Sequence, residues 1–241
     1  MQITQEDLAL LRSVKLHFCI PCYGGMVNEG FFISMLKFMA AAHRLGMNFT
    51  VDTMVNESLI PRGRNSLVAK FLAFEPKSTH LMFVDADLGF EPEEIIKLVL
   101  ADKDVAGGLY PKKALPVQYV VNKIPNGETD PKNPNLVTVS NLGTGFMLIK
   151  REVIEKLIRK RPDLHYQDAI GLDPKYDPYK YQLFNGEIDP ITKEYLSEDY
   201  FFCKLVREEL GLSIFADLSI KLDHCGYYKF SGDPTQLKPY L

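Results

Sequence analysis

Between residues 15 and 110 the chain alternates strand-like apolar segments with segments whose apolar residues recur at helical spacing. The strand-like segments are 15–20, 48–55, 80–85 and 104–110, and the helix-like segments are 31–45, 64–74 and 92–101. A β-α-β-α-β-α-β order predicts a doubly wound α/β sheet, because parallel strands need a crossover connection and helices supply it. The nearly all-apolar segment 80–85 is typical of a strand that is buried on both faces.

The second half of the chain is less regular. Prolines and turn residues crowd 111–135, which predicts a hairpin and loop, and a strand at 145–150 and a helix at 151–160 follow. Residues 161–196 are rich in Pro, Asp, Gly and Tyr, and an irregular segment of that length is usually functional or disordered. A helix at 198–210 and strands within 213–224 complete the chain, and the absence of repeats favours a single domain.

Composition excludes several classes of protein. The chain is 46% hydrophobic and 24% charged, with a formal net charge of -3, so it has no overall attraction for nucleic acid. No stretch approaches the roughly 20 apolar residues of a membrane span, and the N-terminus does not read as a signal peptide. Cys19 and Cys22 form a C-x-x-C, but Cys203 and Cys225 lack zinc-ribbon spacing, which favours buried reduced thiols. We expect a soluble cytoplasmic protein.

Two carboxylates follow the third strand, at Asp85 and Asp87. In open α/β sheets, ligands bind outside the carboxyl ends of the strands. Paired carboxylates there can hold Mg²⁺ or Mn²⁺ while leaving positions open for phosphate oxygens. The alternative is that one aspartate caps the next helix and the other is solvated, since D-x-D often occurs by chance.

Other polar residues lie where strands end. Arg62, Arg64 and Asn65 follow the second strand at a helix start, where guanidinium groups and backbone N–H groups can hold a diphosphate. Glu198 and Asp199 begin a later helix, where an acid can cap the helix or act as a general base. His224 follows the last apolar strand and could complete a metal site, although a lone histidine is more often structural.

Together these motifs resemble those of glycosyltransferases of the GT-A type, most closely the large inverting family 2. The matching stretches occur in the family's order: CIPCYGG, GRNSL, MFVDAD, AGGLY, NLGTGFMLIKREV, the Glu-Asp pair in SEDYFF and the histidine in KLDHCGY. Two of them also resemble stretches of glycosyltransferases from large DNA viruses and phages. The chain departs from the family at Leu88, where many members have a further aspartate, at Gly24-Gly25, where Asn is common, and at Gly63, where Ala is usual.

The resemblance implies a GT-A (Rossmann-like) doubly wound mixed sheet in one domain, 1–241, with a nucleotide-sugar-binding half near 14–110 and an acceptor-binding half near 111–241. It implies metal-dependent transfer of a hexose from a UDP- or GDP-sugar to a hydroxyl of a glycan acceptor, with inversion and with Mn²⁺ or Mg²⁺ as cofactor. The implied metal ligands are Asp85, Asp87 and His224. The implied nucleotide-sugar contacts are Pro21, Tyr23, Arg62, Arg64, Asn65 and Asp85.

In the same resemblance Asp199 would be the catalytic base, and Glu198 would hydrogen-bond the acceptor or exchange that role with Asp199. We expect the acceptor under 161–196, where residues suited to binding sugar faces and hydroxyls include Tyr176, Tyr179, Tyr181, Tyr195, Asp173 and Asp177. These tyrosines could equally pack the segment onto the domain. Pro111, Pro116 and Pro125 would shape a lid that orders with the donor.

Three rival functions use similar residues. A haloacid-dehalogenase-like phosphatase carries D-x-D on its first strand, whereas here the motif follows the third. A sugar-phosphate nucleotidylyltransferase carries a basic Gly-rich loop after the first strand, and PCYGGMVNEG contains no basic residue. A carbohydrate- or nucleotide-binding module without catalysis stays open.

Overall fold

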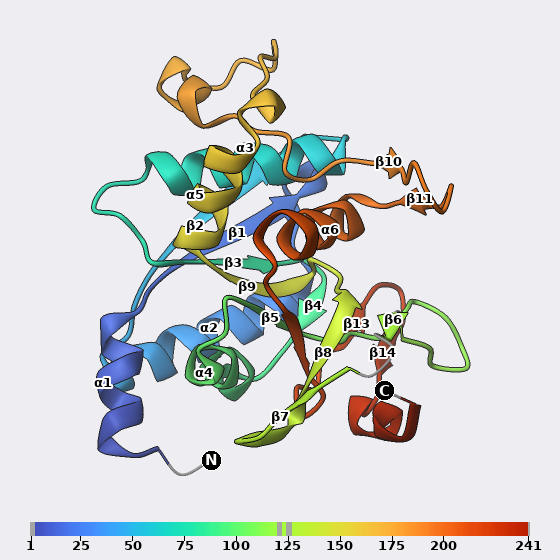
Figure 1. The fold of residues 1–241 in the computed structure, drawn as a ribbon. Helices are drawn as coiled ribbons and strands as arrows, with labels where there is room; N and C mark the ends of the chain where they lie inside the picture. The colour runs from blue at the N-terminus through green and yellow to red at the C-terminus, as the bar shows by residue number, and fades with distance from the viewer. Residues whose placement is uncertain (1–2, 120–121, 124–126, 241) are drawn as a thin grey trace.

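The computed structural model describes residues 3–119, 122–123 and 127–240, so Pro125 lies outside the described residues (Figure 1). The α-helices are α1 (Gln5–Ser13), α2 (Glu29–Leu45), α3 (Ile60–Ala73), α4 (Pro92–Ala101), α5 (Arg151–Lys160) and α6 (Glu198–Leu210). The strands before residue 120 are β1 (Lys15–Cys22), β2 (Asn48–Val55), β3 (His80–Val84), β4 (Leu88–Gly89) and β5 (Val105–Gly108).

The later strands include several short ones. They are β6 (Asn122–Lys123), β7 (Thr129–Asp130), β8 (Asn133–Asn141), β9 (Phe146–Lys150), β10 (Glu187–Ile188), β11 (Tyr195–Leu196), β12 (Ile214–Asp217), β13 (Asp223–Cys225) and β14 (Lys229–Ser231). The 3₁₀ segments are η1 (Tyr23–Gly25), η2 (Pro162–Leu164), η3 (Pro174–Tyr179) and η4 (Pro234–Tyr240).

The main sheet has the strand order β2-β1-β3-β9-β5-β12-β8-β6, with β7 paired to β8. β1 runs parallel to β2 and β3, and β12 runs parallel to β5, whereas β9 lies antiparallel between β3 and β5. The predicted α/β, doubly wound mixed sheet is therefore confirmed. The strand β8 was not predicted, because its polar and apolar residues do not alternate strictly, and the helix expected from residue 64 begins at Ile60.

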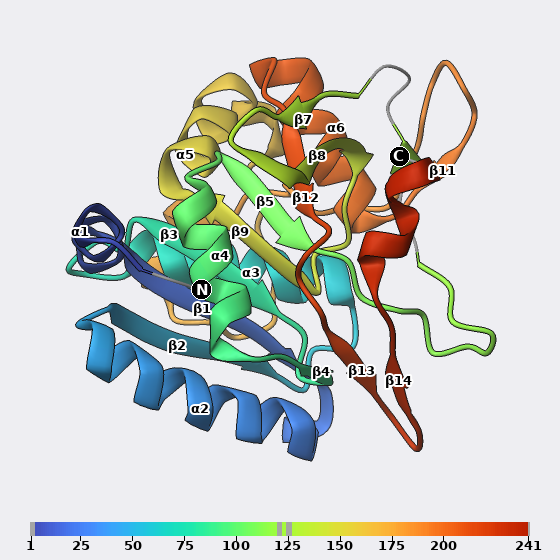
Figure 2. The ribbon, with the colours of Figure 1, turned by 90° about the horizontal axis from the view of Figure 1, so that it is seen from below.

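Helices cover both faces of this sheet (Figure 2). On β3, Leu81 and Phe83 pack toward α3, α5 and α6, whereas Met82 and Val84 pack toward α1, α2 and α4. Successive side chains of a strand point to opposite faces, so one apolar strand contributes to two separate hydrophobic cores. The prediction that this strand is buried on both faces is confirmed, and the end of β3 is thereby fixed in position.

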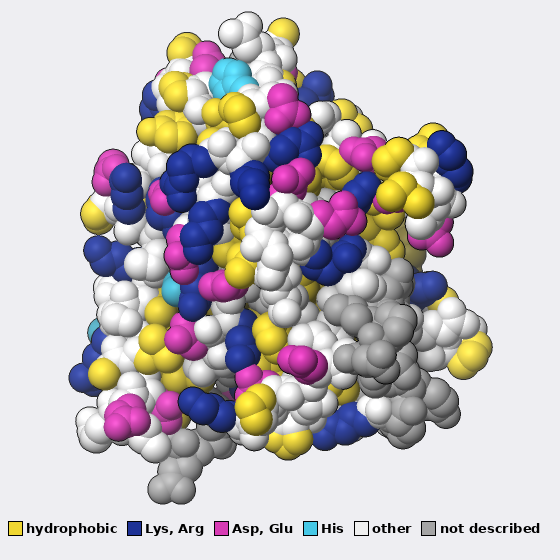
Figure 3. All heavy atoms as spheres, viewed as in Figure 1, with side chains coloured by type: hydrophobic (Ala, Val, Ile, Leu, Met, Phe, Trp, Pro, Cys, Tyr) yellow, Lys and Arg dark blue, Asp and Glu magenta, His cyan; other side chains and the backbone are white. Residues whose placement is uncertain are grey.

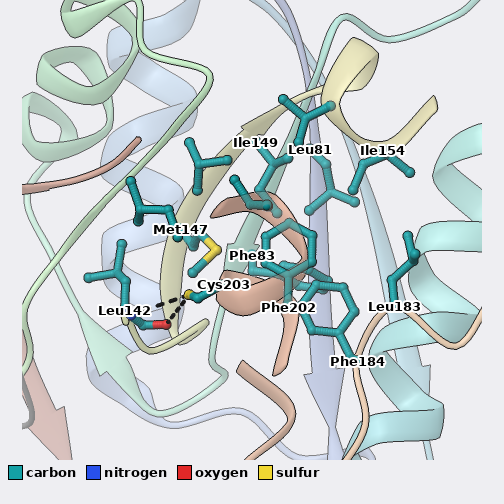
Figure 4. Packing of buried hydrophobic residues seen from close by; sticks show 14 of the residues in the cluster. Leu81, Phe83, Leu142, Met147, Ile149, Ile154, Leu183, Phe184, Phe202 and Cys203 are labelled. Carbon is teal, nitrogen blue, oxygen red and sulfur yellow. Dashed lines mark hydrogen bonds between the residues drawn. The ribbon is translucent and has the colours of Figure 1, made fainter. Parts of the chain in front are cut away.

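The core between the sheet and α6 contains a cluster of aromatic side chains (Figure 4). The Phe184 ring stacks on Phe202 with ring centroids 4.6 Å apart, and Phe83 meets Phe184 edge-on at 5.3 Å. Cys203 lies beside this cluster, where its thiol exchanges hydrogen bonds with the backbone of Leu142. All four cysteines are buried and free, as expected for reduced structural thiols.

None of the helices in the described part of the chain is long and apolar enough to cross a membrane. On the coloured part of the face in Figure 3, basic and acidic side chains are interspersed rather than gathered by sign.

Candidate active site

The site is built on a tight turn that follows β3. The turn closes through a hydrogen bond from Leu88 N to Asp85 O of 3.0 Å. Three remote segments hold its backbone, through the bonds Asp85 N to Gly145 O (2.9 Å), Asn28 N to Ala86 O (2.8 Å) and Cys225 N to Asp87 O (2.8 Å). Because each of the three turn residues is fixed to a different element, the two aspartates are held in a set arrangement.

Asp87 faces His224. β13 pairs with β4 so that His224 lies opposite Leu88, and this register brings His224 Nε2 to 3.5 Å from Asp87 Oδ2. His224 Nδ1 lies 2.8 Å from the Pro111 carbonyl oxygen, a hydrogen bond that requires a protonated Nδ1. The Nε2 atom of a neutral His224 is then a free ligand atom directed at Asp87, the orientation found in metal-bound histidines.

A lysine shares the same carboxylate oxygen. Lys113 Nζ lies 2.6 Å from Asp87 Oδ2. Burial raises the pKa of Asp87, but the neighbouring His224 and the hydrogen bond from Lys113 outweigh burial, and the net shift is downward. Asp87 is therefore charged at neutral pH and available to a cation.

Asp85 points the other way, toward Arg64 on α3. Arg64 Nη2 donates to Asp85 Oδ1 at 3.0 Å, and Arg64 Nε donates to Glu198 Oε1 at 3.4 Å. The Arg64 side chain is only 5% exposed, and its guanidinium lies over the Phe83 ring. Burial lowers the pKa of Arg64, but the charges of Asp85 and Glu198 raise it by more than burial lowers it. The net shift is upward, so Arg64 stays charged. The Arg64 Nη1 atom is buried without a hydrogen-bond partner among the described residues, so it can donate to a ligand.

The predicted metal ligands are thus brought to one place only in part. Asp87 and His224 touch, while Asp85 is paired with Arg64. In the described ranges, no group of three or more His, Cys, Asp or Glu side chains is arranged to hold a metal. A carboxylate and an imidazole with a free Nε2 nevertheless fit Mn²⁺ or Mg²⁺, which keep water and phosphate oxygens in their other positions.

Two cavities lie beside the contact of Asp87 with Lys113 and His224. The first, of about 500 Å³, is lined by Pro21, Tyr23, Met26, Val27, Asn28, Glu57, Ile60, Arg64, Asp85, Ala86 and Asp87. The second, of about 430 Å³, is lined by Gly108, Leu109, Tyr110, Lys112, Lys113, Gly143, Ser197, Asp199, Tyr200 and His224. Asp87 lines the first cavity and its partners Lys113 and His224 line the second, so a ligand bound across Asp87 would extend into both.

Asp199 lies in the second cavity, in the first turn of α6. Its Oδ1 atom accepts hydrogen bonds from the Ser197 hydroxyl and from Tyr200 N, the latter at 2.9 Å. Burial raises the pKa of Asp199, the nearby charge of Glu198 adds to this, and the two hydrogen bonds oppose it without cancelling it. A raised pKa brings a carboxylate closer to the range of an effective general base.

The predicted nucleotide contacts separate into two groups. Pro21, Tyr23, Arg64 and Asp85 line the first cavity, but Arg62 forms a two-pronged pair with Glu57, at 2.7 and 3.0 Å. Asn65 is buried, and its side-chain amide pairs with the backbone of Phe184 through bonds of 2.8 and 2.9 Å. The structure thus directs Asn65 into the core, where it fastens the segment after residue 180 to α3.

The residues expected to bind the acceptor lie elsewhere. Figure 1 shows that α3 separates η3 from the sheet. None of Tyr176, Tyr179, Tyr181 and Asp177 lines either cavity. Tyr181 packs edge-on against His165, and Asp177 pairs with Lys180 at 2.9 Å. This arrangement favours the alternative interpretation, in which these residues pack the segment onto the domain.

Several cavity residues escaped the sequence analysis. Glu57, Tyr110, Lys113 and Tyr200 line the two cavities. Tyr110 and Tyr200 belong to the stretches AGGLY and SEDYFF but were assigned no role, and Glu57 and Lys113 lie outside the matched stretches. The available signal was weak: Tyr110 is the last residue of the strand predicted at 104–110, at the same sheet edge as Asp85.

No protein-family profile and no curated protein matches the chain. Among solved structures, A197 from STIV is similar, with 17% identity, coverage of 92% of this chain and 91% of that chain, and a TM-score of 0.53. GalNAc-T7 with UDP, GalNAc and Mn²⁺ matches at 11% identity, over 90% of this chain and 44% of that chain, with a TM-score of 0.44. The 4-diphosphocytidyl-2C-methyl-D-erythritol synthase of Anaerococcus prevotii DSM 20548 matches at 10% identity, over 71% and 84%, with a TM-score of 0.37. The match to A197, at 17% identity, indicates a shared fold and assigns no reaction.

Proposed function

We propose that the chain is a metal-dependent glycosyltransferase of the GT-A type that moves a hexose from a UDP- or GDP-sugar to a hydroxyl of a glycan acceptor. The observation that carries this proposal is that Asp87 lines one cavity with Arg64 and contacts Lys113 and His224, which line a second cavity with Asp199. A nucleoside diphosphate sugar has three parts, and this arrangement offers a distinct environment for each.

The nucleoside occupies the first cavity in this proposal. Pro21 presents an apolar surface to the base and Tyr23 presents an aromatic ring. The Tyr23 side chain is well exposed and can stack on the base. Asp85 accepts from the ribose hydroxyls through the carboxylate oxygen that Arg64 leaves free. The unpartnered Nη1 of Arg64 donates to the diphosphate.

The diphosphate lies at the boundary, next to Asp87 and His224. These two residues would hold Mn²⁺ or Mg²⁺, and the ion would neutralise charge on the departing nucleoside diphosphate. Arg64 adds a fixed positive charge on the same side, and its burial keeps it in place without reorganisation during the reaction.

The transferred sugar and the acceptor hydroxyl occupy the second cavity. Asp199 takes the proton of the acceptor hydroxyl as the acceptor oxygen bonds to C1 and the bond from C1 to the nucleoside diphosphate breaks. General-base assistance of this kind contributes about 10²–10⁴-fold. Glu198 contacts Arg64, so in this proposal it positions the guanidinium and leaves the base role to Asp199. Asp199 and Arg64 line different cavities. In this proposal the base therefore approaches C1 from the side opposite the leaving diphosphate, which leads to inversion at C1.

Incubation with UDP- and GDP-sugars, with and without Mn²⁺, tests the proposal. We expect slow release of UDP or GDP that depends on the metal, and its loss in Asp199→Asn. Phosphate release from a phosphomonoester would instead indicate a phosphatase, and pyrophosphate exchange a nucleotidylyltransferase. Binding of the nucleotide sugar without turnover would indicate a binding module.

A further inference from the structure

Lys113 forms an ion pair with Asp87 Oδ2, the carboxylate oxygen through which a metal between Asp87 and His224 would bind. Its Nζ atom lies 2.6 Å from Asp87 Oδ2, and His224 Nε2 approaches the same oxygen at 3.5 Å. A divalent ion on this oxygen would sit about 2.0–2.2 Å from it, inside the space that the ammonium fills. The two cations also repel each other, so Asp87 cannot hold both through one oxygen.

The loop that carries Lys113 is tied to the site at its base. The Pro111 carbonyl accepts from His224 Nδ1 at 2.8 Å, and Lys112 N donates to Gln118 O at 2.7 Å, which closes the loop. The Lys113 stem passes over Gly226, since a Cβ added there would lie 3.7 Å from its Cδ and Cε atoms. The ammonium can therefore leave Asp87 by rotation of the lysine stem while the loop stays in place.

Once released from Asp87, the ammonium group of Lys113 can bind the diphosphate of a bound donor. Lys113 lines the second cavity together with Asp199 and His224, and its side chain is 42% exposed. A diphosphate bound across Asp87 brings two or more anionic oxygens to this boundary, and an ammonium group is a suitable donor to them.

We infer that Lys113 is a resident counter-ion of Asp87 that a divalent cation displaces, and that the displaced ammonium then binds the diphosphate of the donor. This inference rests on the proposed function. It makes Lys113 act in opposite directions on two binding steps, weakening binding of the metal alone and strengthening binding of the nucleotide diphosphate once the metal is present.

Mn²⁺ binding to the full chain without nucleotide tests the first step, measured by the electron spin resonance of free Mn²⁺. We expect Lys113→Ala to bind Mn²⁺ roughly 3- to 10-fold more tightly than the wild type, because a competing positive charge is removed. Lys113→Arg keeps the charge and should not tighten binding. Lys221→Ala is the matched control, since Lys221 makes a similar exposed pair with Asp233 at 2.7 Å, outside both cavities.

UDP binding at saturating Mn²⁺, measured by calorimetry, tests the second step. We expect Lys113→Ala to weaken UDP binding roughly 5- to 20-fold, the loss of one charged hydrogen bond. A lysine that only stabilised the loop would not tighten Mn²⁺ binding when removed, so the opposite signs identify the exchange.

Two outcomes would overturn the inference. Unchanged or weaker Mn²⁺ binding in Lys113→Ala removes the competition, and unchanged UDP binding removes the second contact. If the wild type binds Mn²⁺ through Asp87 and transfers sugar while Lys113→Ala behaves like the wild type, only the inference fails. If neither protein binds Mn²⁺, the inference and the metal dependence of the proposed function fail together.

Discussion

Arg64 Nε lies 3.4 Å from Glu198 Oε1, although the two residues are 134 positions apart in the chain. The contact joins the start of α3, in the first half of the sequence, to the start of α6, in the second half. Because Arg64 also donates to Asp85, one guanidinium links the turn after β3 with the helix that carries Asp199. The relative position of the two carboxylates that the proposed reaction needs thus depends on this side chain.

Replacing Arg64 should destabilise the protein. Arg64→Met leaves Asp85 and Glu198 without their partner, and their side chains are only 29% and 20% exposed. Loss of one partner from a partly buried cluster of charges costs about 1–3 kcal/mol, below the value for full burial because these carboxylates retain some water. The free energy of unfolding in urea measures the effect. The exposed Arg44→Met is the control and should change it by less than about 0.5 kcal/mol; an equal effect in both variants would contradict the prediction.

Asp87→Ala should remove the metal dependence of nucleotide binding. Asp87 is the carboxylate that His224 Nε2 and Lys113 both face, so the variant has no anionic ligand at this point. Calorimetric titration with UDP in the presence and absence of Mn²⁺ measures this, and the two titrations should become alike. Asp233→Ala serves as the control, because Asp233 pairs with Lys221 away from the cavities. A wild-type response to Mn²⁺ in Asp87→Ala would place the metal elsewhere.

Local sequence patterns predicted the helices and strands that position the site. The order of the strands in the sheet depends on long-range pairing, which those patterns do not contain. The helices at Pro92–Ala101 and Arg151–Lys160 follow the expected ranges, because their apolar periodicity and first residues are local signals. The antiparallel insertion of β9 between β3 and β5 is a choice of neighbour that periodicity does not encode.

The site shows the same division. The position of Asp85 and Asp87 at a strand end could be predicted from sequence, since an apolar strand ends there. Lys113 reaches Asp87 only because β13 and the Pro111 carbonyl hold the loop beside it. The tyrosines near residue 180 resemble a sugar-binding set in composition, but packing against α3 decides their role, and composition does not report it.

Gly145 should not tolerate a side chain, because Tyr110 fills the space beside it. A Cβ at Gly145 would lie 2.7 Å from Tyr110 Cζ and 2.8 Å from its hydroxyl oxygen. We expect Gly145→Ala to lower the free energy of unfolding by about 1–3 kcal/mol, the usual cost of overpacking. In a Tyr110→Ala background the same substitution should cost clearly less, and urea unfolding of the four proteins measures the coupling. Gly211→Ala, with open space around it, should cost the same in both backgrounds.

Asp199→Asn should abolish sugar transfer while leaving donor binding nearly unchanged. Asparagine has the same shape and still accepts from Ser197 and Tyr200 N, but it cannot take a proton from the acceptor. Single-turnover transfer and UDP-sugar binding, measured on one preparation, separate the two effects. Transfer at the original rate would show that Asp199 is not the base.

The pH dependence of transfer should report the environment of Asp199. A general base works only when ionised, so activity is present above its pKa and is lost as the pH falls through it. Burial raises the pKa of Asp199, so the acid limb of kcat/KM should lie above the range of an exposed aspartate. The Ser197 hydroxyl donates to Asp199 and holds this pKa down, so Ser197→Ala should move the acid limb to higher pH. The exposed Ser213→Ala should leave the profile unchanged, and an acid limb that stays in place in Ser197→Ala would assign it to a different group.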